Sequence, residues 1–162
     1  MLLDVDGVVN AFPHTPTDSW DDFRQTDCAG FTITHSLDMG KRIKALDADI
    51  VTTWEQDDMA NEWIAPLFGW DDLPILHAGD EWYRRGWWKS TVLQKFIMEN
   101  PRPFVWLDDD LDYSDQRGEI DWVRECGLPF LLISPKTEMG LEPRHFELIE
   151  AFLANPVKEM VP

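Results

Sequence analysis

The stretch Leu3-Asp4-Val5-Asp6-Gly7-Val8-Val9-Asn10 places two acidic residues directly after a short apolar run. This pattern predicts a buried strand that ends near Asp4, followed by a sharp turn that Gly7 permits. In such a turn Asp4 and Asp6 point toward one place while Val5 packs away. Two carboxylates arranged in this way can hold Mg²⁺, or can divide the work of nucleophile and acid/base. The same residues would also fit a solvated acidic loop.

Short apolar runs alternate along the chain with segments of helical period. Strands are predicted at residues 1–5, 49–53, 73–77, 103–107 and 129–133. Apolar helix faces are predicted at Met39, Ile43 and Leu46; at Met59, Trp63 and Leu67; at Trp88, Val92 and Phe96; and at Phe146, Ile149 and Phe152. A shorter helix is predicted at residues 118–126. This alternation predicts an α/β domain with a mostly parallel sheet.

A second acidic cluster, Asp108-Asp109-Asp110-Leu111-Asp112, follows the apolar residues 104–107. Because parallel strands end at one edge of a sheet, we expect Asp108 and Asp109 to meet the first cluster there. Carboxylates that converge without a cation repel one another, and oxygen-only ligands favour a hard cation such as Mg²⁺. The alternative, a charged and solvated helix start, is harder to reconcile with two such clusters.

Two polar residues lie between the acidic clusters in the sequence. Thr52 ends the predicted strand 49–53, and Lys89 begins an amphipathic segment, where its ammonium can reach a phosphate oxygen. Each residue alone is unremarkable. Their order is informative: Asp-x-Asp, then Thr, then Lys, then Asp-Asp.

That order resembles the haloacid dehalogenase (HAD) superfamily of phosphohydrolases over about residues 1–134. The four motifs are matched in turn by Asp4-Val5-Asp6-Gly7-Val8, by Thr52, by Lys89 and by Val105-Trp106-Leu107-Asp108-Asp109. Within the superfamily, the chain looks like the small HAD domain group associated with RNA-repair proteins. That likeness comes from Asp6-Gly7-Val8-Val9-Asn10, Thr52-x-Trp54 with Ala60-Asn61, Trp88-Lys89, residues 106–110 and residues 135–141.

The resemblance implies a three-layer Rossmann-like fold in one domain, residues 1–162, with about five parallel strands in the order 5-4-1-2-3. HAD enzymes gain selectivity from cap insertions, and here residues 10–35 leave room only for a minimal cap, or flap. A second loop, residues 78–86, carries Arg84 and Arg85. Such an open site can admit the end of a macromolecule, or a small metabolite if Trp20, Phe31 or Trp82 closes over it.

The resemblance also implies roles for the catalytic residues. Asp4 would be the nucleophile and form an aspartyl-phosphate, while Asp6 would protonate the leaving oxygen and then activate water. Thr52 and Lys89 would bind the transferring phosphoryl oxygens. Thr53 could replace Thr52 if the strand ends one residue later.

A Mg²⁺ cofactor follows from the same resemblance. Its implied ligands are the Asp4 carboxylate, the Asp6 backbone carbonyl and Asp108, with Asp109 as a further ligand or as a neighbour of the ligands. Asp112 could instead be the more distal acid of the fourth motif, because it lies four residues after Asp108.

The composition limits the partners. Asp and Glu number 31 against 14 Lys and Arg, a net charge of −17, which argues against an extended nucleic-acid-binding surface. Cys28 and Cys126 are far apart and do not resemble a disulfide framework, so we expect both to be reduced thiols. No apolar run approaches the ~18 residues of a membrane span, and no signal-peptide pattern is found. We therefore expect a cytoplasmic protein that does not associate with membranes.

These observations favour a Mg²⁺-dependent phosphatase acting on a nucleotide, a nucleic-acid end or a small phosphoester. One alternative is a phosphoacceptor switch, because receiver domains also gather acids, a Thr and a Lys at one sheet edge. The acid at Asp6, two residues after the nucleophile, favours hydrolysis over storage. The other alternative is a non-catalytic domain that binds a metal or a partner.

Overall fold

A computed structural model describes residues 1–12, 19–54, 58–83, 86–113 and 117–157. Its centre is a parallel sheet of four strands in the order β4-β1-β5-β6. The strands are β1 (Leu2–Leu3), β4 (Val51–Thr52), β5 (Phe104–Leu107) and β6 (Phe130–Ile133). In the register of the sheet, Leu3 lies between Thr52 and Leu107. The residues that follow these three therefore leave the sheet side by side.

Four of the five predicted strands are confirmed, and the fifth is reduced to a bridge. Within residues 73–77, Ile75 pairs with Thr52, next to β4. The backbone N–H of Thr52 donates to Pro74 O, and that of Leu76 donates to Thr52 O. Pro74 has no N–H with which to extend the ladder. A five-stranded sheet in the order 5-4-1-2-3 stays a prediction.

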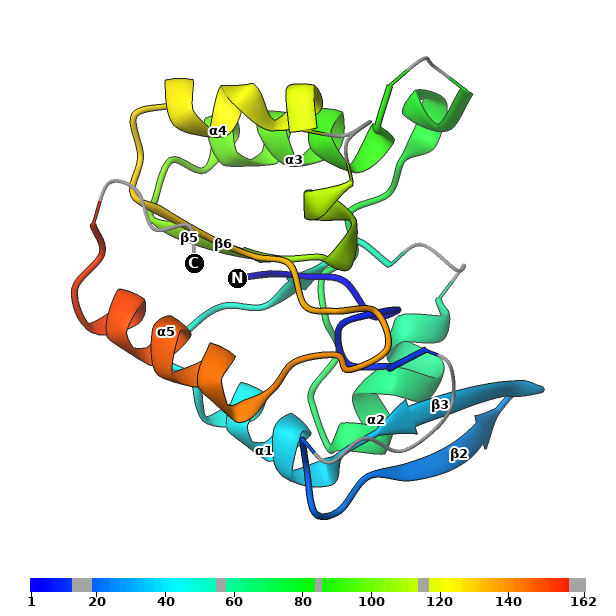
Figure 1. Cartoon of the computed structure of the whole chain (residues 1–162). Coiled ribbons are helices and arrows are strands. Elements are labelled where there is room, and N and C mark those ends of the chain that lie inside the picture. Colours follow the sequence, from blue (N-terminus) through cyan, green and yellow to red (C-terminus); the bar gives the residue numbers. More distant parts are fainter. Residues whose placement is uncertain (13–18, 55–57, 84–85, 114–116, 158–162) are drawn as a thin grey trace.

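Helices cover both faces of the sheet (Figure 1). One face is covered by α1 (Leu37–Ala45), α2 (Ala65–Phe68) and α5 (Pro143–Ala154), and the other by α3 (Trp88–Glu99) and α4 (Asp121–Glu125). Successive strand residues point to opposite faces of the sheet, so they belong to two separate hydrophobic cores. The first core includes Leu3, Val105 and Leu107, and the second includes Leu2, Phe104 and Trp106. Because both faces are buried, the strands are apolar without alternation. The domain is a three-layer α/β structure.

Two of the predicted helix faces are correct. Phe146, Ile149 and Phe152 are all buried in α5. In α1, Met39 and Ile43 are buried, and the helix ends at Leu46 as its C-cap. The predicted helix at residues 118–126 is also present, although its first turn is a 3₁₀ helix, Arg117–Ile120, before α4 begins.

The other two predicted faces are wrong. Trp63 is 38% exposed, and the buried residues of that segment include Ala60, Ile64 and Phe68. The segment begins as a π-helix, Ala60–Ile64, whose wider turn changes the spacing of the buried face.

In α3 the buried stripe is Ser90, Leu93 and Ile97 rather than Trp88, Val92 and Phe96, which are half-buried. The hydroxyl of Ser90 donates to Glu119 O and accepts from Trp122 Nε1 at 2.8 Å. These bonds turn the Ser90 side of the helix toward α4.

Within the flap region of residues 10–35, the described residues include an antiparallel hairpin of β2 (Arg24–Cys28) and β3 (Phe31–His35). The hairpin projects at one end of the molecule (Figure 1). Its two-residue turn has positive φ at both Ala29 and Gly30, as a tight hairpin requires. Phe31, directly after the turn, is 58% exposed.

Two further findings concern the cysteines and the helices. Cys28 and Cys126 are both free thiols, which agrees with the expectation. Among the helices that the structure describes, none has the length and apolar character needed to cross a membrane.

Candidate active site at the carboxyl edge of the sheet

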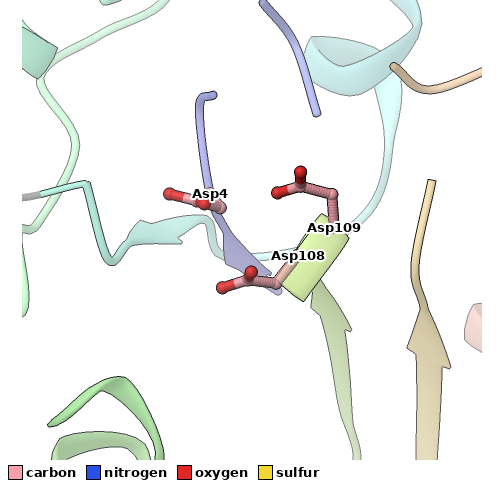
Figure 2. A group of neighbouring side chains, drawn as sticks. All are labelled: Asp4, Asp108 and Asp109. Atoms are coloured by element: carbon pink, nitrogen blue, oxygen red, sulfur yellow. The ribbon is translucent and has the colours of Figure 1, made fainter. Parts of the chain in front are cut away.

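Three aspartates meet where β1 and β5 end. Asp4 follows β1, and Asp108 and Asp109 follow β5 (Figure 2). One carboxylate oxygen from each of the three lies within 4.8 Å of the others. Asp4 and Asp108 are buried. The two acidic segments therefore come together at the sheet edge, as parallel pairing of their strands predicts.

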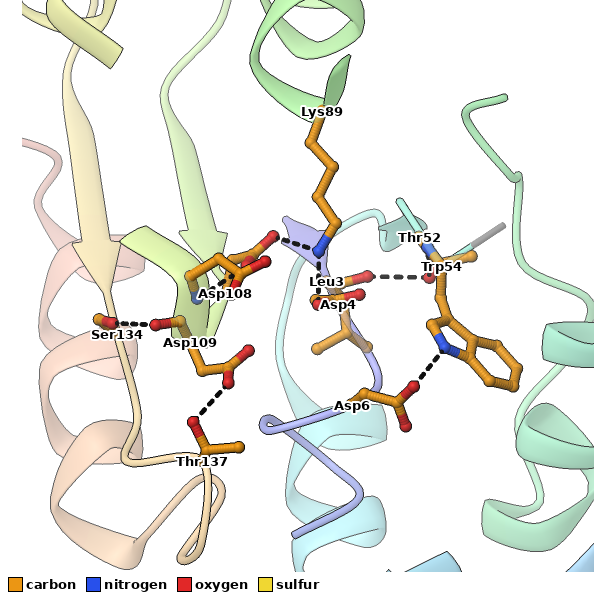
Figure 3. Close-up of polar contacts among 11 residues, drawn as sticks. Leu3, Asp4, Asp6, Thr52, Trp54, Lys89, Asp108, Asp109, Ser134 and Thr137 are labelled. Atoms are coloured by element: carbon orange, nitrogen blue, oxygen red, sulfur yellow. Dashed lines mark hydrogen bonds and ion pairs between the residues drawn. The ribbon is translucent and has the colours of Figure 1, made fainter. Parts of the chain in front are cut away.

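The ammonium group of Lys89 contacts the two buried carboxylates, Asp4 and Asp108 (Figure 3). It lies in the first turn of α3, and its Nζ is 2.6 Å from Asp4 Oδ2 and 3.0 Å from Asp108 Oδ2. Burial opposes the charge of the ammonium, but Asp4 and Asp108 outweigh it and raise the pKa of Lys89 above its ordinary value. Lys89 is therefore a permanent cation between the two acids.

The carboxylates are more difficult to ionise than usual. Burial raises the pKa of Asp4, and the attraction of Lys89 offsets this only in part. Burial and the charge of Asp4 together raise the pKa of Asp108 to about 8. Asp4 Oδ1 is also buried without a hydrogen-bond partner among the described residues. Because nearly all buried polar atoms are paired, this oxygen is available to a ligand.

Asp109 is held from the opposite side. Its Oδ2 accepts a hydrogen bond from Thr137 Oγ1 at 2.6 Å, and its backbone carbonyl accepts one from Ser134 Oγ at 2.9 Å. Burial raises its pKa, which the Thr137 hydrogen bond partly offsets. The other candidate for the distal acid, Asp112, is exposed and stands outside the cluster.

Gly7 permits the close approach of Asp109. A Cβ at this position would lie 2.2 Å from Asp109 Cγ, and the φ of Gly7 is +70°. The turn needs glycine for two reasons, a left-handed backbone and the absence of a side chain.

The carboxylate of Asp6 does not join the other acids, so the expected convergence of Asp4 and Asp6 side chains is wrong. Asp6 Oδ1 accepts from Asn10 Nδ2 at 2.8 Å, and Oδ2 accepts from Trp54 Nε1 at 3.0 Å. These two donors turn the carboxylate toward Trp54 and away from Asp109 (Figure 3). Metal binding through the Asp6 backbone carbonyl stays a prediction.

The two threonines at the end of β4 differ in their hydrogen bonds. The hydroxyl of Thr52 donates to Leu3 O at 2.8 Å and accepts from the backbone N–H of Trp54 at 3.1 Å. The hydroxyl of Thr53 is buried and has no partner in the described part of the chain. The Thr53 hydroxyl is therefore the freer of the two to bind a phosphoryl oxygen.

Sequence reasoning assigned no role to the residues that hold the acids in place, which are Asn10, Trp54, Ser134 and Thr137. Asn10, Trp54 and Thr137 lie in segments that carry the family resemblance, and Asn10 is also close to Asp6 in sequence, four residues away, so a tight turn can bring the two together. Trp20, expected as a possible cover, donates from Nε1 to Leu141 O and packs edge-on against Phe146. Arg84 and Arg85 lie outside the described residues, as do the details of the Trp82 side chain.

Comparison of the chain with protein-family models, with curated proteins and with solved structures found no match. The functional argument therefore depends on the site itself. Two buried carboxylates, a third acid and a lysine surround one point at the sheet edge, and a separately held carboxylate lies two residues after the first. Such a set can bind a divalent cation, attack an electrophile and exchange a proton.

Proposed function

We propose that this chain is a Mg²⁺-dependent phosphatase of the HAD type that hydrolyses phosphomonoesters through an aspartyl-phosphate on Asp4. The observation that carries this proposal is the buried Asp4–Lys89–Asp108 arrangement at the ends of adjacent parallel strands. The observed order β6-β5-β1-β4, with Ile75 bridged beside β4, supports the five-strand HAD order as part of the same proposal.

The donor set fits Mg²⁺. Asp4, Asp108 and Asp109 offer one oxygen each within a small volume, and carboxylate oxygens are the ligands that Mg²⁺ prefers. The buried, unpartnered Asp4 Oδ1 is an oxygen for which a cation would supply the missing contact. When bound, Mg²⁺ would neutralise negative charge on the phosphoryl group and on the acids around it.

The chain's own residues account for the two halves of the reaction. A carboxylate oxygen of Asp4 attacks phosphorus, the ester bond breaks, and the leaving oxygen takes a proton from Asp6. The ionised Asp6 then removes a proton from water, which attacks the phosphoryl group and releases inorganic phosphate while Asp4 is restored. Lys89 and the Thr53 hydroxyl hold phosphoryl oxygens.

The fixed position of Asp6 favours hydrolysis over a phosphoacceptor switch. Asn10 and Trp54 each donate one hydrogen bond to its carboxylate, so an acid/base group is held in a fixed orientation two residues after the nucleophile. A switch needs a long-lived phosphoaspartate and gains nothing from such a group. The substrates we propose are nucleotides, nucleic-acid ends or small phosphoesters.

Hydrolysis of acetyl phosphate and of 4-nitrophenyl phosphate, with Mg²⁺ or with EDTA, tests the proposal. We expect Mg²⁺-dependent turnover that Asp4→Asn reduces by about 10³-fold or more, because it removes the nucleophile. Asp112→Asn, an exposed acid outside the cluster, is the matched control and should retain wild-type turnover. Turnover that survives Asp4→Asn would refute the mechanism.

A second measurement separates the phosphatase from the switch. Acid quench and hydroxylamine trapping report the lifetime of the acyl-phosphate on Asp4. A short-lived species in the wild type that persists longer in Asp6→Asn supports the proposed role of Asp6. A stable species in the wild type identifies a phosphoacceptor, and Mg²⁺ binding without either chemistry identifies a binding domain.

A further inference from the structure

A small pocket lies beside Asp6, on the side of the β2–β3 hairpin. Its volume is about 120 Å³, and its lining includes Asp6, Phe12, Phe31, Trp54 and Met59. Three of these five side chains are aromatic, and they come from three segments: the turn after β1, the tip of the hairpin and the end of β4. The pocket therefore joins an apolar lining to the carboxylate that we propose as the acid.

The hairpin is fixed relative to that carboxylate. Asn10 donates from Nδ2 to Asp6 and accepts at Oδ1 from the backbone N–H of Thr34 in β3, both at 2.8 Å. The backbone N–H of Ala11 donates to Thr34 O at 2.9 Å. The hairpin and Asp6 are therefore linked through one buried side chain.

Phe31 presents an apolar ring to solvent at this pocket, with 58% of its surface exposed. A bound apolar group would cover this ring, and ligand sites are lined mainly by apolar and aromatic side chains with a few polar groups. Among the residues that the structure describes, those that line the pocket include no Lys or Arg. The lining therefore suits an apolar group rather than a second phosphate.

We infer that this pocket binds a flat ring in the leaving group of the substrate, with the ring against Phe31 and Trp54 and the ester oxygen facing Asp6. The inference rests on the proposed function, in which Asp6 protonates the leaving oxygen. Because Asp6 itself lines the pocket, a ring bound there would lie close to the ester oxygen that Asp6 protonates. A volume of about 120 Å³ is sufficient for one ring. The substrate class is an aryl or arylmethyl phosphomonoester.

Binding of phosphonates, which are not hydrolysed, tests the pocket independently of turnover. Titration calorimetry in Mg²⁺ would compare benzylphosphonate with cyclohexylmethylphosphonate, which has the same carbon skeleton without the flat ring, and with methylphosphonate. We expect benzylphosphonate to bind about 2- to 10-fold more tightly than its cyclohexyl counterpart, as aromatic contacts typically give. Methylphosphonate should bind more weakly than either.

Pocket variants then locate the contact. Phe31→Ala should weaken benzylphosphonate binding about 5- to 100-fold, the range for loss of one stacking partner, and should leave methylphosphonate binding unchanged. Met98→Ala, an exposed apolar side chain on α3 that does not line this pocket, is the control and should change neither. Trp54→Phe keeps a ring but loses the N–H to Asp6, so it should slow hydrolysis more than it weakens phosphonate binding.

Several outcomes overturn the inference. Equal affinity for the benzyl and cyclohexylmethyl compounds excludes a flat-ring site, and an equal effect of Phe31→Ala on all three phosphonates excludes contact with the ring. Sensitivity to Phe31→Ala that appears only with nucleoside 5′-monophosphates places the ring beyond a sugar and excludes the aryl class.

If phosphonates bind as expected but no phosphoester is hydrolysed, the proposed phosphatase fails while the ring pocket stands.

Discussion

Removal of the Lys89 charge is the sharpest test of the buried cluster. Lys89→Met keeps most of the apolar stem of the side chain and removes the ammonium that contacts Asp4 and Asp108. The side chain of Lys89 is 11% exposed, and those of its partners are 5% and 0% exposed. With little water available to replace the lysine, the variant leaves two acids facing each other in the protein interior.

The size of the effect follows from this burial. Loss of one partner from a buried ion pair typically destabilises a protein by about 3–5 kcal/mol. Proton uptake limits the loss here, because the pKa of Asp108 is already about 8 and the site can neutralise an acid. At pH 7 we therefore expect Lys89→Met to lower the free energy of unfolding by about 2–4 kcal/mol.

The pH dependence has a definite sign. A carboxyl whose pKa is raised in the folded state binds more protons folded than unfolded, so its contribution to stability is lost as pH rises toward the folded pKa. For Asp108 that window runs from the ordinary carboxyl range up to about 8. Without Lys89 the folded pKa rises further, so the difference between variant and wild type should be larger at pH 9 than at pH 7.

Urea denaturation followed by tryptophan fluorescence, in EDTA at pH 7 and pH 9, measures these differences. Lys95→Met on the same helix is the matched control, because Lys95 is exposed, and its effect should stay within about 0.5 kcal/mol. Added Mg²⁺ should recover more stability in Lys89→Met than in the wild type, since it supplies the missing positive charge. If Lys89→Met is no less stable than Lys95→Met at pH 9, the buried cluster does not have the energetics described.

Two further predictions concern the metal and the turn. Because the pKa of Asp108 is about 8, Mg²⁺ binding at pH 7 should release close to one proton, measured by calorimetry in buffers of different ionisation enthalpy. Mg²⁺ affinity should rise with pH and level off above about 8; proton-neutral binding at pH 7 would contradict this reasoning. Gly7→Ala should cost about 1–3 kcal/mol of stability through its left-handed backbone, and should also weaken Mg²⁺ binding, because its Cβ would collide with Asp109. Gly30→Ala has a similar positive φ but open space around it, so it should leave Mg²⁺ binding intact; equal Mg²⁺ affinities in the two variants would count against the role of Gly7.

The parts of the site that could be predicted are those set by strand ends. Each acidic segment follows a short apolar run, and parallel pairing brings the ends of such runs to one edge. Leu3 beside Leu107 in the sheet is therefore enough to place Asp4 near Asp108. The position of Lys89 follows from the same logic, because Lys89 lies in the first turn of α3, the helix that packs on the β5 face of the sheet.

The parts that could not be predicted depend on contacts between distant residues. The orientation of Asp6 is set by Trp54, 48 residues away, and the Thr52 hydroxyl is engaged by Leu3, 49 residues away. No local pattern carries this information. The error at Trp63 has a different origin, since a count at 3.6 residues per turn does not detect a π-helical turn.

The net charge of −17 and the buried cluster of Asp4, Lys89 and Asp108 act on a ligand over different distances. Surface acids are hydrated and cost little, whereas Asp4 and Asp108 are buried beside a single lysine and must take up protons or a cation. A protein that keeps such a cluster in its interior gives up stability there, which is typical of a functional site. The surface charge acts at longer range and repels a polyanion, although salt screens it within about 10 Å. The Mg²⁺ that we propose would therefore attract a single terminal phosphate at short range, while an extended nucleic-acid backbone would meet the repulsion along its whole length.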